Sequence, residues 1–264
     1  MTERTETLQQ NSAGMAGLEV LFDFDPISLT EMDEVKMMNR FDSKFVFTKA
    51  FLPKILDAIQ NDYYVLKTEG TRIQLYNTVY FDTTDDHFYL AHHNGRSNRL
   101  KLRKREYADS GRVFLEIKTK TNKGLSTKSR MEILGFENYL TKEEAVFVGQ
   151  HSSVETETLE AKFGSRFHRI TLVSKNLDER CTFDLNIQLN SFLSGESELK
   201  DLVIAEVKRE KQFSKSKLVQ VFKEYKIRSQ SFSKYCFGRA LNEDDLKSNI
   251  FKAGIQQIKN QIKS

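Results

Sequence analysis

The stretch Arg99-Leu100-Lys101-Leu102-Arg103-Lys104-Arg105 places basic residues at positions 99, 101, 103 and 105, with leucines at 100 and 102. A period of two is the period of a β-strand, in which successive side chains point to opposite faces. One face of the predicted strand would carry four cations, and the other would begin apolar. Half-buried strands usually alternate apolar with mixed polar residues, so this stretch indicates a strand that faces something anionic.

The two segments that follow repeat the alternation. Their charged positions are Glu116, Lys118 and Lys120 in the first, and Lys128, Arg130 and Glu132 in the second. Asp109-Ser110-Gly111 and Asn122-Lys123-Gly124, which connect the segments, are typical of hairpin turns. We therefore expect three neighbouring antiparallel strands with a common charged face, as in a closed barrel lined with Arg, Lys and a few Glu.

Local charge is more informative here than net charge. The chain of 264 residues has 41 Lys and Arg against 37 Asp and Glu, a formal charge of only +4. Residues 99–130 contain eleven basic residues (99, 101, 103, 104, 105, 112, 118, 120, 123, 128 and 130) against three acids (106, 109 and 116). This segment, and not the whole chain, predicts an anionic ligand.

The composition, and the lack of Pro- or Gly-rich linkers, favour one domain. A hydrophobic content of 39% with 20 Phe is enough for a core, and two Pro with no Gly-rich linker or internal repeat give no sign of a boundary. We expect residues 1–25 to be a flexible tail, residues 26–248 to be the domain, and residues 249–264 to be a helical tail.

The rest of the chain alternates predicted helices and strands. Helices are expected from Pro26 to Met38, over 49–60, after the turn at 82–86, over 140–163, and from Ser214 onward with a break near 228–231; further strands are expected at 40–47, 63–67, 73–81, 166–175, 180–190 and 201–209. Long strands in hairpins with helices inserted between them predict an α+β, mainly antiparallel fold.

Targeting signals and metal motifs are not evident. No apolar run approaches the length of a membrane span, and the first residues lack the apolar core of a signal peptide. Cys181 and Cys236 have no metal-ligand spacing. We expect a cytoplasmic protein with two inert thiols.

The later strands extend the charged face. The inward set predicted from alternation is Lys44, Lys101, Arg103, Arg105, Glu116, Lys118, Lys120, Lys128, Arg130, Arg180, Asp184, Glu206 and Lys208. So many like charges would be prohibitive to bury unpaired. Arg and Lys suit phosphate oxygens, and Glu suits Mg²⁺ or Mn²⁺, so triphosphate or polyphosphate with one or two divalent ions is the expected ligand.

Seven motifs in order resemble one family. They are Lys44 in KFVF, the RxKxRxR strand at 99–105, LEIKTK with Glu116 and Lys118, KSR at 128–130, RxTFD at 180–184, AEVK at 205–208, and Phe232-Ser233-Lys234-Tyr235. Over residues 38–241 the sequence resembles VTC domains, the polyphosphate polymerase domains of the triphosphate tunnel metalloenzyme superfamily. The resemblance implies a closed antiparallel tunnel of about eight strands with helices outside.

The resemblance also implies an activity, in which ATP donates its γ-phosphate to a growing polyphosphate chain. The residues expected to be catalytic are Lys44, Arg103, Lys118 and Arg180; those expected to bind phosphate are Lys101, Arg105, Lys120, Lys128, Arg130, Lys208 and Lys234; those expected to hold Mn²⁺ or Mg²⁺ are Glu206 and Glu116. Such a site acts by alignment and charge neutralisation, without a protein nucleophile. Any membrane-protein partner is expected to be encoded separately.

Two other functions stay open. Hydrolytic relatives of the CYTH type begin with ExExK, whereas this chain reads Arg40-Phe41-Asp42-Ser43-Lys44; fewer carboxylates favour a polymerase, and a triphosphatase would need a further ligand such as Asp42. A module that binds polyphosphate or an inositol polyphosphate without turnover is the other alternative. Nucleic acid is not expected as a partner, because aromatic residues do not interleave the cations as stacking platforms require.

Overall fold

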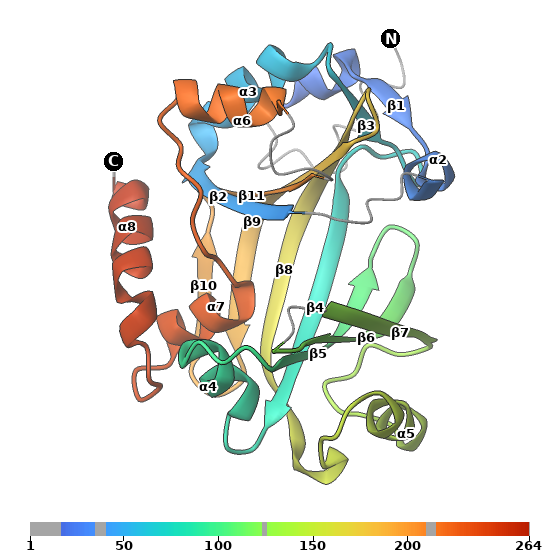
Figure 1. Cartoon of the computed structure of the whole chain (residues 1–264), viewed down its shortest axis with the longest axis vertical. Helices are drawn as coiled ribbons and strands as arrows, with labels where there is room; N and C mark the ends of the chain where they lie inside the picture. The colour runs from blue at the N-terminus through green and yellow to red at the C-terminus, as the bar shows by residue number, and fades with distance from the viewer. Residues whose placement is uncertain (1–16, 35–40, 123–125, 210–214, 264) are drawn as a thin grey trace.

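The computed structural model describes residues 17–34, 41–122, 126–209 and 215–263. Met38, Arg40, Lys123, Gly124 and Ser214, which took part in the expected elements, lie outside these ranges. The described residues form one eleven-stranded sheet with helices on both of its faces (Figure 1). None of the described helices is both long and apolar enough to span a membrane.

Eight strands form the continuous path of the sheet, and all of its neighbours are antiparallel. In spatial order they are β2 (Phe41–Thr48), β11 (Leu202–Arg209), β9 (Glu179–Ser191), β8 (Leu159–Ser174), β4 (Gln74–Thr83), β5 (Arg99–Tyr107), β6 (Arg112–Lys120) and β7 (Ser126–Ile133). Three shorter strands, β1 (Asp25–Ile27), β3 (Tyr63–Leu66) and β10 (Gly195–Leu199), pair beside this path. The expected α+β, antiparallel class is confirmed.

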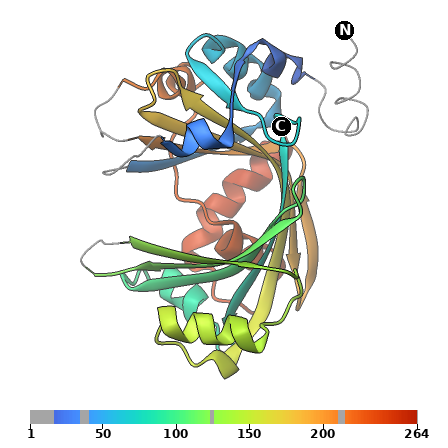
Figure 2. The same ribbon diagram turned by 90° about the vertical axis from the view of Figure 1, so that its right-hand side faces the viewer.

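The sheet is bent but not closed. Figure 2 shows the green strands β5, β6 and β7 as one wall opposite the wall that contains the blue strand β2. Among the described strands, β2 and β7 end the path without pairing, so the expected closure by hydrogen bonds is not found. Lys44 on β2 and Lys128 and Arg130 on β7 all line the space between these two edges, so both edges carry cations towards it.

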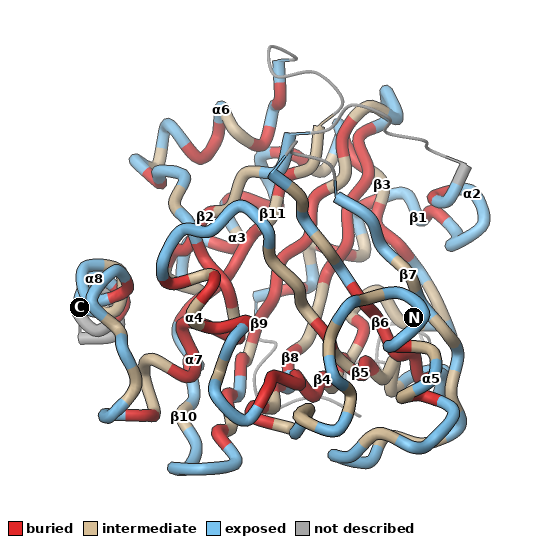
Figure 3. Tube along the Cα trace, turned by 60° about the horizontal axis from the view of Figure 1, so that its bottom comes forward, coloured by how far each residue is buried: buried red, intermediate tan, exposed pale blue. Residues whose placement is uncertain are grey.

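Helices and short turns of helix cover the sheet. Their bounds are η1 (Glu19–Asp23), α2 (Leu29–Glu34), η2 (Lys49–Phe51), α3 (Leu52–Ile59), α4 (His87–His93), α5 (Lys142–His151), η3 (Thr156–Thr158), α6 (Lys217–Glu224), α7 (Lys234–Asn242), η4 (Asn249–Phe251) and α8 (Lys252–Lys263). Figure 3 shows the buried residues concentrated along the central strands. The helices therefore bury the apolar faces that the strands present.

Alternation along the strands explains which face each helix covers. Phe45, Phe47 and Phe183 point away from the charged face and pack with α3 and α6. Leu115 and Ile117 likewise point outward and pack near α5. The charged face is left to the concave side, where α7, with α4 and α8 behind it, packs onto part of the same surface.

Lys104 is a charged residue on the outward face of β5, which begins with apolar residues. Its side chain is fully buried on the outward face of β5, where its Nζ lies 2.9 Å from Glu144 of α5 and donates to the Tyr139 carbonyl at 2.8 Å. Buried lysines need such partners. This pair fastens α5 to the back of β5.

Two expected elements differ from the structure, and one strand was not expected. The helix expected over 140–163 ends at His151, and β8 begins at Leu159. Residues 159–161 are good helix formers, but here they pair with β4, and this tertiary pairing overrides their helix propensity. Pro26 lies in β1 and not in a helix, and β10 was not expected.

The N-terminal residues that the structure describes are packed. Leu18, Leu21 and Phe24 are each at most 3% exposed and belong to the core beneath α3. The folded part of the chain therefore begins before residue 26.

Candidate functional site

A cavity of about 1030 Å³ lies on the concave face of the sheet. Strands from both walls line it, together with the N-terminus of α7 and the segments around α2 and β3. Its charged lining consists of thirteen cations, Lys44, Lys67, Lys101, Arg103, Arg105, Arg112, Lys118, Lys128, Arg130, Arg169, Arg180, Lys208 and Lys234, and seven acids, Asp33, Asp42, Glu69, Asp109, Glu116, Asp184 and Glu206. The cavity is therefore strongly electropositive.

The structure brings twelve of the thirteen predicted site residues to this cavity. Lys120 is the exception, because it is exposed at the end of β6 and does not line the cavity. Arg99, the first cation of the run at 99–105, also lies elsewhere: its guanidinium is 3.3 Å from Nδ1 of His92 on α4. The two differences share a cause, since both residues lie at the same end of the paired strands β5 and β6.

Glu116 joins three adjacent strands. Arg103 of β5 and Lys128 of β7 lie on either side of it, with a nitrogen of each 2.6 Å from its carboxylate. Burial alone would raise the pKa of this carboxyl, but Arg103, Arg105 and Lys128 together hold it well below its usual value. Glu116 is therefore ionised at neutral pH and keeps its cations fixed.

Glu206 likewise holds two cations in place, on the opposite wall. Its two carboxylate oxygens accept from Lys44 of β2 and from Lys208 of β11. The two lysines outweigh the effect of burial and lower the pKa of Glu206 far below its usual range. Burial lowers the pKa of Lys208 in spite of this pair, so the lysine would gain from a second anionic partner.

Asp184 forms a third such group at the middle of the sheet. Arg169 of β8 donates to both carboxylate oxygens, at 2.6 and 2.8 Å, and Lys234 of α7 donates to one of them. These cations lower the pKa of Asp184 well below its usual value although the group is buried. Asp184 thus ties the N-terminus of α7 to the cavity wall.

Arg169 was missed from the sequence. The signal was present, because Arg169 and Thr171 alternate with Ile170 and Leu172 in an expected strand. The guanidinium also lies over the rings of Tyr76 and Phe167, at 5.1 and 5.2 Å. Arg169 therefore belongs with the predicted cations of the cavity.

A buried polar network fixes α7, the helix that carries Lys234. Ser233 caps the helix by accepting from the backbone N–H of Cys236, and its hydroxyl lies 3.4 Å from Lys101 Nζ. Further along the helix the hydroxyl of Tyr235 donates to Asp82, and the fully buried Arg239 bridges to Asp86 at 2.6 Å. A fixed helix presents Lys234 at a fixed place.

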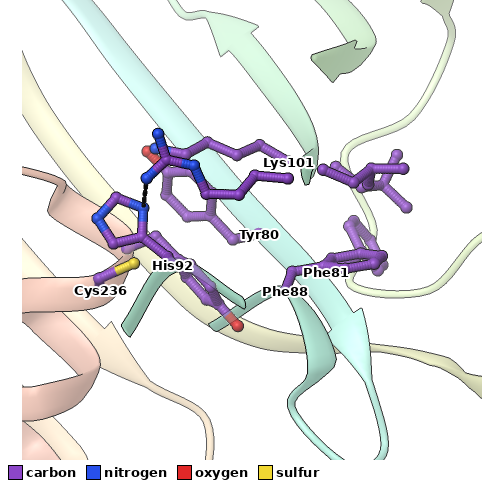
Figure 4. A pocket seen from close by; sticks show the side chains of 10 residues that line it. Tyr80, Phe81, Phe88, His92, Lys101 and Cys236 are labelled. Carbon is purple, nitrogen blue, oxygen red and sulfur yellow. Dashed lines mark hydrogen bonds between the residues drawn. The ribbon is translucent and has the colours of Figure 1, made fainter. Parts of the chain in front are cut away.

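A second, much smaller cavity of about 10 Å³ is shown in Figure 4. His92, Cys236 and Tyr80 line it, and Lys101 and Tyr80 line both cavities. Burial, with Lys101 and Arg99 nearby, lowers the pKa of His92 to about 4, so the imidazole is neutral at physiological pH. The small cavity is large enough for about one water molecule.

The carboxylates of the cavity suit a divalent ion only if oxygens of a bound ligand complete its coordination. Among the described residues no group of three or more His, Cys, Asp or Glu side chains could hold a metal ion alone. Mg²⁺ is commonly bound by one or two carboxylates together with phosphate oxygens and water. Glu206, with Asp42 diagonally across on β2, fits that arrangement, and so does Glu116.

Comparison with known proteins adds a family match. The sequence model of the VTC domain matches residues 39–242, and a search of curated proteins gives no match. Among solved structures, a candidate adenylyl cyclase from Hippeastrum, described as having a dominant triphosphatase activity, is 16% identical, with a TM-score of 0.49 over 78% of this chain and 97% of that one. A candidate adenylate cyclase from Bacillus halodurans is 12% identical, with a TM-score of 0.45 over 74% of this chain and 94% of that one.

Proposed function

Because the chain belongs to the VTC domain family, we propose that it is a polyphosphate polymerase-like phosphotransferase that moves the γ-phosphate of ATP to a growing polyphosphate chain. The observation that carries the proposal is the cationic cavity between the two walls, whose lining has six more cations than acids. An extended polyanion matches such a surface better than a compact one does, because it can contact both walls along its length.

The paired acids support binding of a chain of phosphates. Glu116, Asp184 and Glu206 each hold two cations in place before any ligand arrives. Preorganised charges stabilise a charged transition state without the cost of rearrangement. Each cation retains donors beyond its acid partner, because Lys has three N–H donors and Arg has five.

Phosphoryl transfer in this cavity needs little covalent chemistry from the protein. Lys44, Arg103, Lys118 and Arg180 would neutralise charge on the transferring group, while the remaining cations hold the donor and acceptor in line. Glu206, with Glu116 less directly, would hold Mg²⁺ or Mn²⁺ together with phosphate oxygens, and the ion would supply further charge neutralisation. The acceptor is itself a phosphate oxygen, so no general base is required.

The proposal includes an enclosed path for the product. Although β2 and β7 are unpaired in the described structure, a phosphate chain between the walls would neutralise their facing cations and let the cavity act as a tunnel. ATP as donor makes the cytoplasm the expected compartment, and a separately encoded membrane partner stays a prediction.

The test is incubation of the purified protein with ATP and Mn²⁺, with products resolved by phosphorus NMR. Internal phosphate resonances that grow together with ADP are expected. Lys118→Ala should lower the rate by about 100-fold, as removal of one transition-state charge contact does. Lys120→Ala is the matched control, because this lysine is two residues further along the same strand but outside the cavity.

Other products would overturn the polymerase. Orthophosphate alone would indicate a triphosphatase, the alternative for which Asp42 beside Glu206 supplies a second carboxylate on the cavity wall. Tight binding of tripolyphosphate, with no turnover of ATP or tripolyphosphate whichever divalent metal ion is added, would indicate a binding module.

A further inference from the structure

Tyr80 of β4 lies at the wall between the two cavities and lines both of them. It is 6% exposed and lies directly opposite Arg103 in the pairing of β4 with β5. Figure 4 shows its ring beside the side chain of Lys101. The residue is thus nearly buried and still borders the cationic cavity.

Among the described residues the hydroxyl of Tyr80 has no hydrogen-bond partner, and neither has that of Tyr76, the other buried tyrosine that lines the cationic cavity. The three remaining buried tyrosines are bonded. Tyr63 donates to Glu179 at 2.5 Å, Tyr89 to the Lys247 carbonyl at 2.8 Å, and Tyr235 to Asp82 at 2.5 Å. Buried polar groups usually have partners. An open hydroxyl at a cavity wall is therefore a donor available to a ligand.

The ring of Tyr80 is held in one orientation. It stacks on Tyr235 with a centroid distance of 5.3 Å and lies 6.3 Å from the ring of Phe163. Tyr235 is in turn fixed by Asp82 and by Arg239, whose Nη1 lies 3.1 Å from its hydroxyl. The Tyr80 hydroxyl therefore keeps its position without a ligand.

Cations surround this hydroxyl from two elements. The titratable and charged groups around it are Lys101, Arg103 and Arg105 of β5, with Arg99 at the small cavity, Lys234, Tyr235 and Cys236 of α7, and His92 of α4. The nearby acids Glu116 and Asp184 are occupied by Arg103 and Lys234 respectively. The local field is thus positive.

We propose that the Tyr80 hydroxyl donates a hydrogen bond to a phosphate oxygen of the bound chain, at the point where the cations of β5 and α7 converge. The proposal rests on the proposed function in so far as the ligand is a chain of phosphates. Tyr80 then adds a short-range, directional contact to a cavity otherwise dominated by charge.

The proposal has a spectroscopic consequence. Burial would raise the pKa of Tyr80, but Arg103, Arg105, Lys234 and Lys101 outweigh burial and lower it, whereas the pKa values of Tyr63, Tyr76, Tyr89 and Tyr235 are raised. A phosphate oxygen at the hydroxyl opposes the cations and disfavours tyrosinate. Binding of the ligand must therefore raise the pKa of Tyr80.

The experiment follows the near-ultraviolet absorbance of tyrosinate during a pH titration, with and without tripolyphosphate and in the absence of metal. One tyrosine should titrate below the others in the free protein and shift upward when tripolyphosphate is added. Tyr80→Phe should abolish this early phase and weaken tripolyphosphate binding about tenfold, the loss expected for one hydrogen bond to a charged group. Tyr64→Phe, which removes a hydroxyl away from both cavities, should change neither quantity.

The outcomes separate the inference from the proposed function. Tripolyphosphate binding with an unshifted early phase, or with equal affinity in Tyr80→Phe of unchanged melting temperature, would overturn the role of Tyr80 alone. Failure of tripolyphosphate to bind the wild-type protein would overturn both. An upward shift that is lost only in Tyr80→Phe supports the inference.

Discussion

Glu206 is the residue at which metal binding and phosphate binding can be separated. Its carboxylate accepts from Lys44 and Lys208, two cations that a phosphate chain would also contact. Glu206→Gln should leave metal-free tripolyphosphate binding unchanged or tighter, because the lysines lose their internal anion. With Mn²⁺ and ATP, turnover should fall by about 100-fold, the loss typical of one electrostatic contact to the transition state. Calorimetry without metal and phosphorus NMR with Mn²⁺ measure the two effects.

A matched surface carboxylate is the control. Glu132 pairs with Arg112, both about half exposed, at 2.8 Å, and exposed pairs contribute little, so Glu132→Gln should alter neither measurement. If Glu206→Gln weakens metal-free binding as much as it lowers turnover, Glu206 serves to order the lysines and not to hold a metal.

The lysines of the cavity predict a pH dependence of binding. Burial lowers the pKa values of Lys101, Lys208 and Lys234. A bound polyanion favours their charged forms and raises these values again, so binding takes up protons in the window between the lowered and restored pKa values. Tripolyphosphate affinity should therefore fall as pH rises through that window, before ordinary surface lysines titrate near their usual pKa.

Proton uptake can be measured directly. Calorimetry at one alkaline pH in two buffers of different ionisation enthalpy gives the number of protons bound, and the same experiment in Tyr80→Phe removes the tyrosine contribution. Uptake that vanishes completely in Tyr80→Phe would mean that the lysines stay charged throughout.

Substitutions at two helical glycines test whether the packing of α7 against the sheet affects stability and ligand binding. A Cβ added at Gly238 of α7 would lie 2.0 Å from the ring of the buried Phe163, whereas one at Gly149 of α5 would meet nothing within 4 Å. Gly238→Ala should lower the free energy of unfolding by about 1–3 kcal/mol through overpacking. It should also weaken tripolyphosphate binding, because α7 carries Lys234. Gly149→Ala should raise the free energy of unfolding by about 0.5–1 kcal/mol.

Denaturant unfolding and calorimetry distinguish the two glycines. Equal stability changes in the two variants would show that α7 can shift away from Phe163 at no cost. A destabilised Gly238→Ala with unchanged binding would show that Lys234 is placed by Asp184 and not by the helix.

Elements with strict alternation could be predicted from the sequence, and elements shaped by tertiary pairing could not. In β5, β6 and β7 the period of two placed Arg103, Glu116 and Lys128 on one face, and the structure joins them. The start of β8 could not be found this way, because residues 159–161 favour a helix in isolation and become a strand through pairing with β4. The period of two shows which face of a strand a side chain lies on, but not how far the cavity extends along the strand. For this reason Lys120 was predicted to bind phosphate although it lies beyond the cavity.

The whole molecule sets how far the walls stand apart, and no local pattern encodes that. Closure depends on whether the edges β2 and β7 meet, and both edges carry cations towards the same cavity. Like charges that face each other oppose closure unless an anion lies between them. We therefore expect a bound polyanion to favour closer approach of the two edges.

Bridging of the two walls predicts a difference between phosphate chains and single phosphates. Tripolyphosphate at about 100 times its Kd should raise stability by about 2.7 kcal/mol, which for a chain of this size is a shift in melting temperature of about 5–10 °C. Orthophosphate at the same phosphorus concentration should give a much smaller shift, because separate phosphates gain no advantage from spanning both walls. Sodium chloride of matched ionic strength controls for screening. Equal stabilisation by tripolyphosphate and orthophosphate would mean that the two walls bind phosphate independently, in which case the cavity has no basis for selecting a chain.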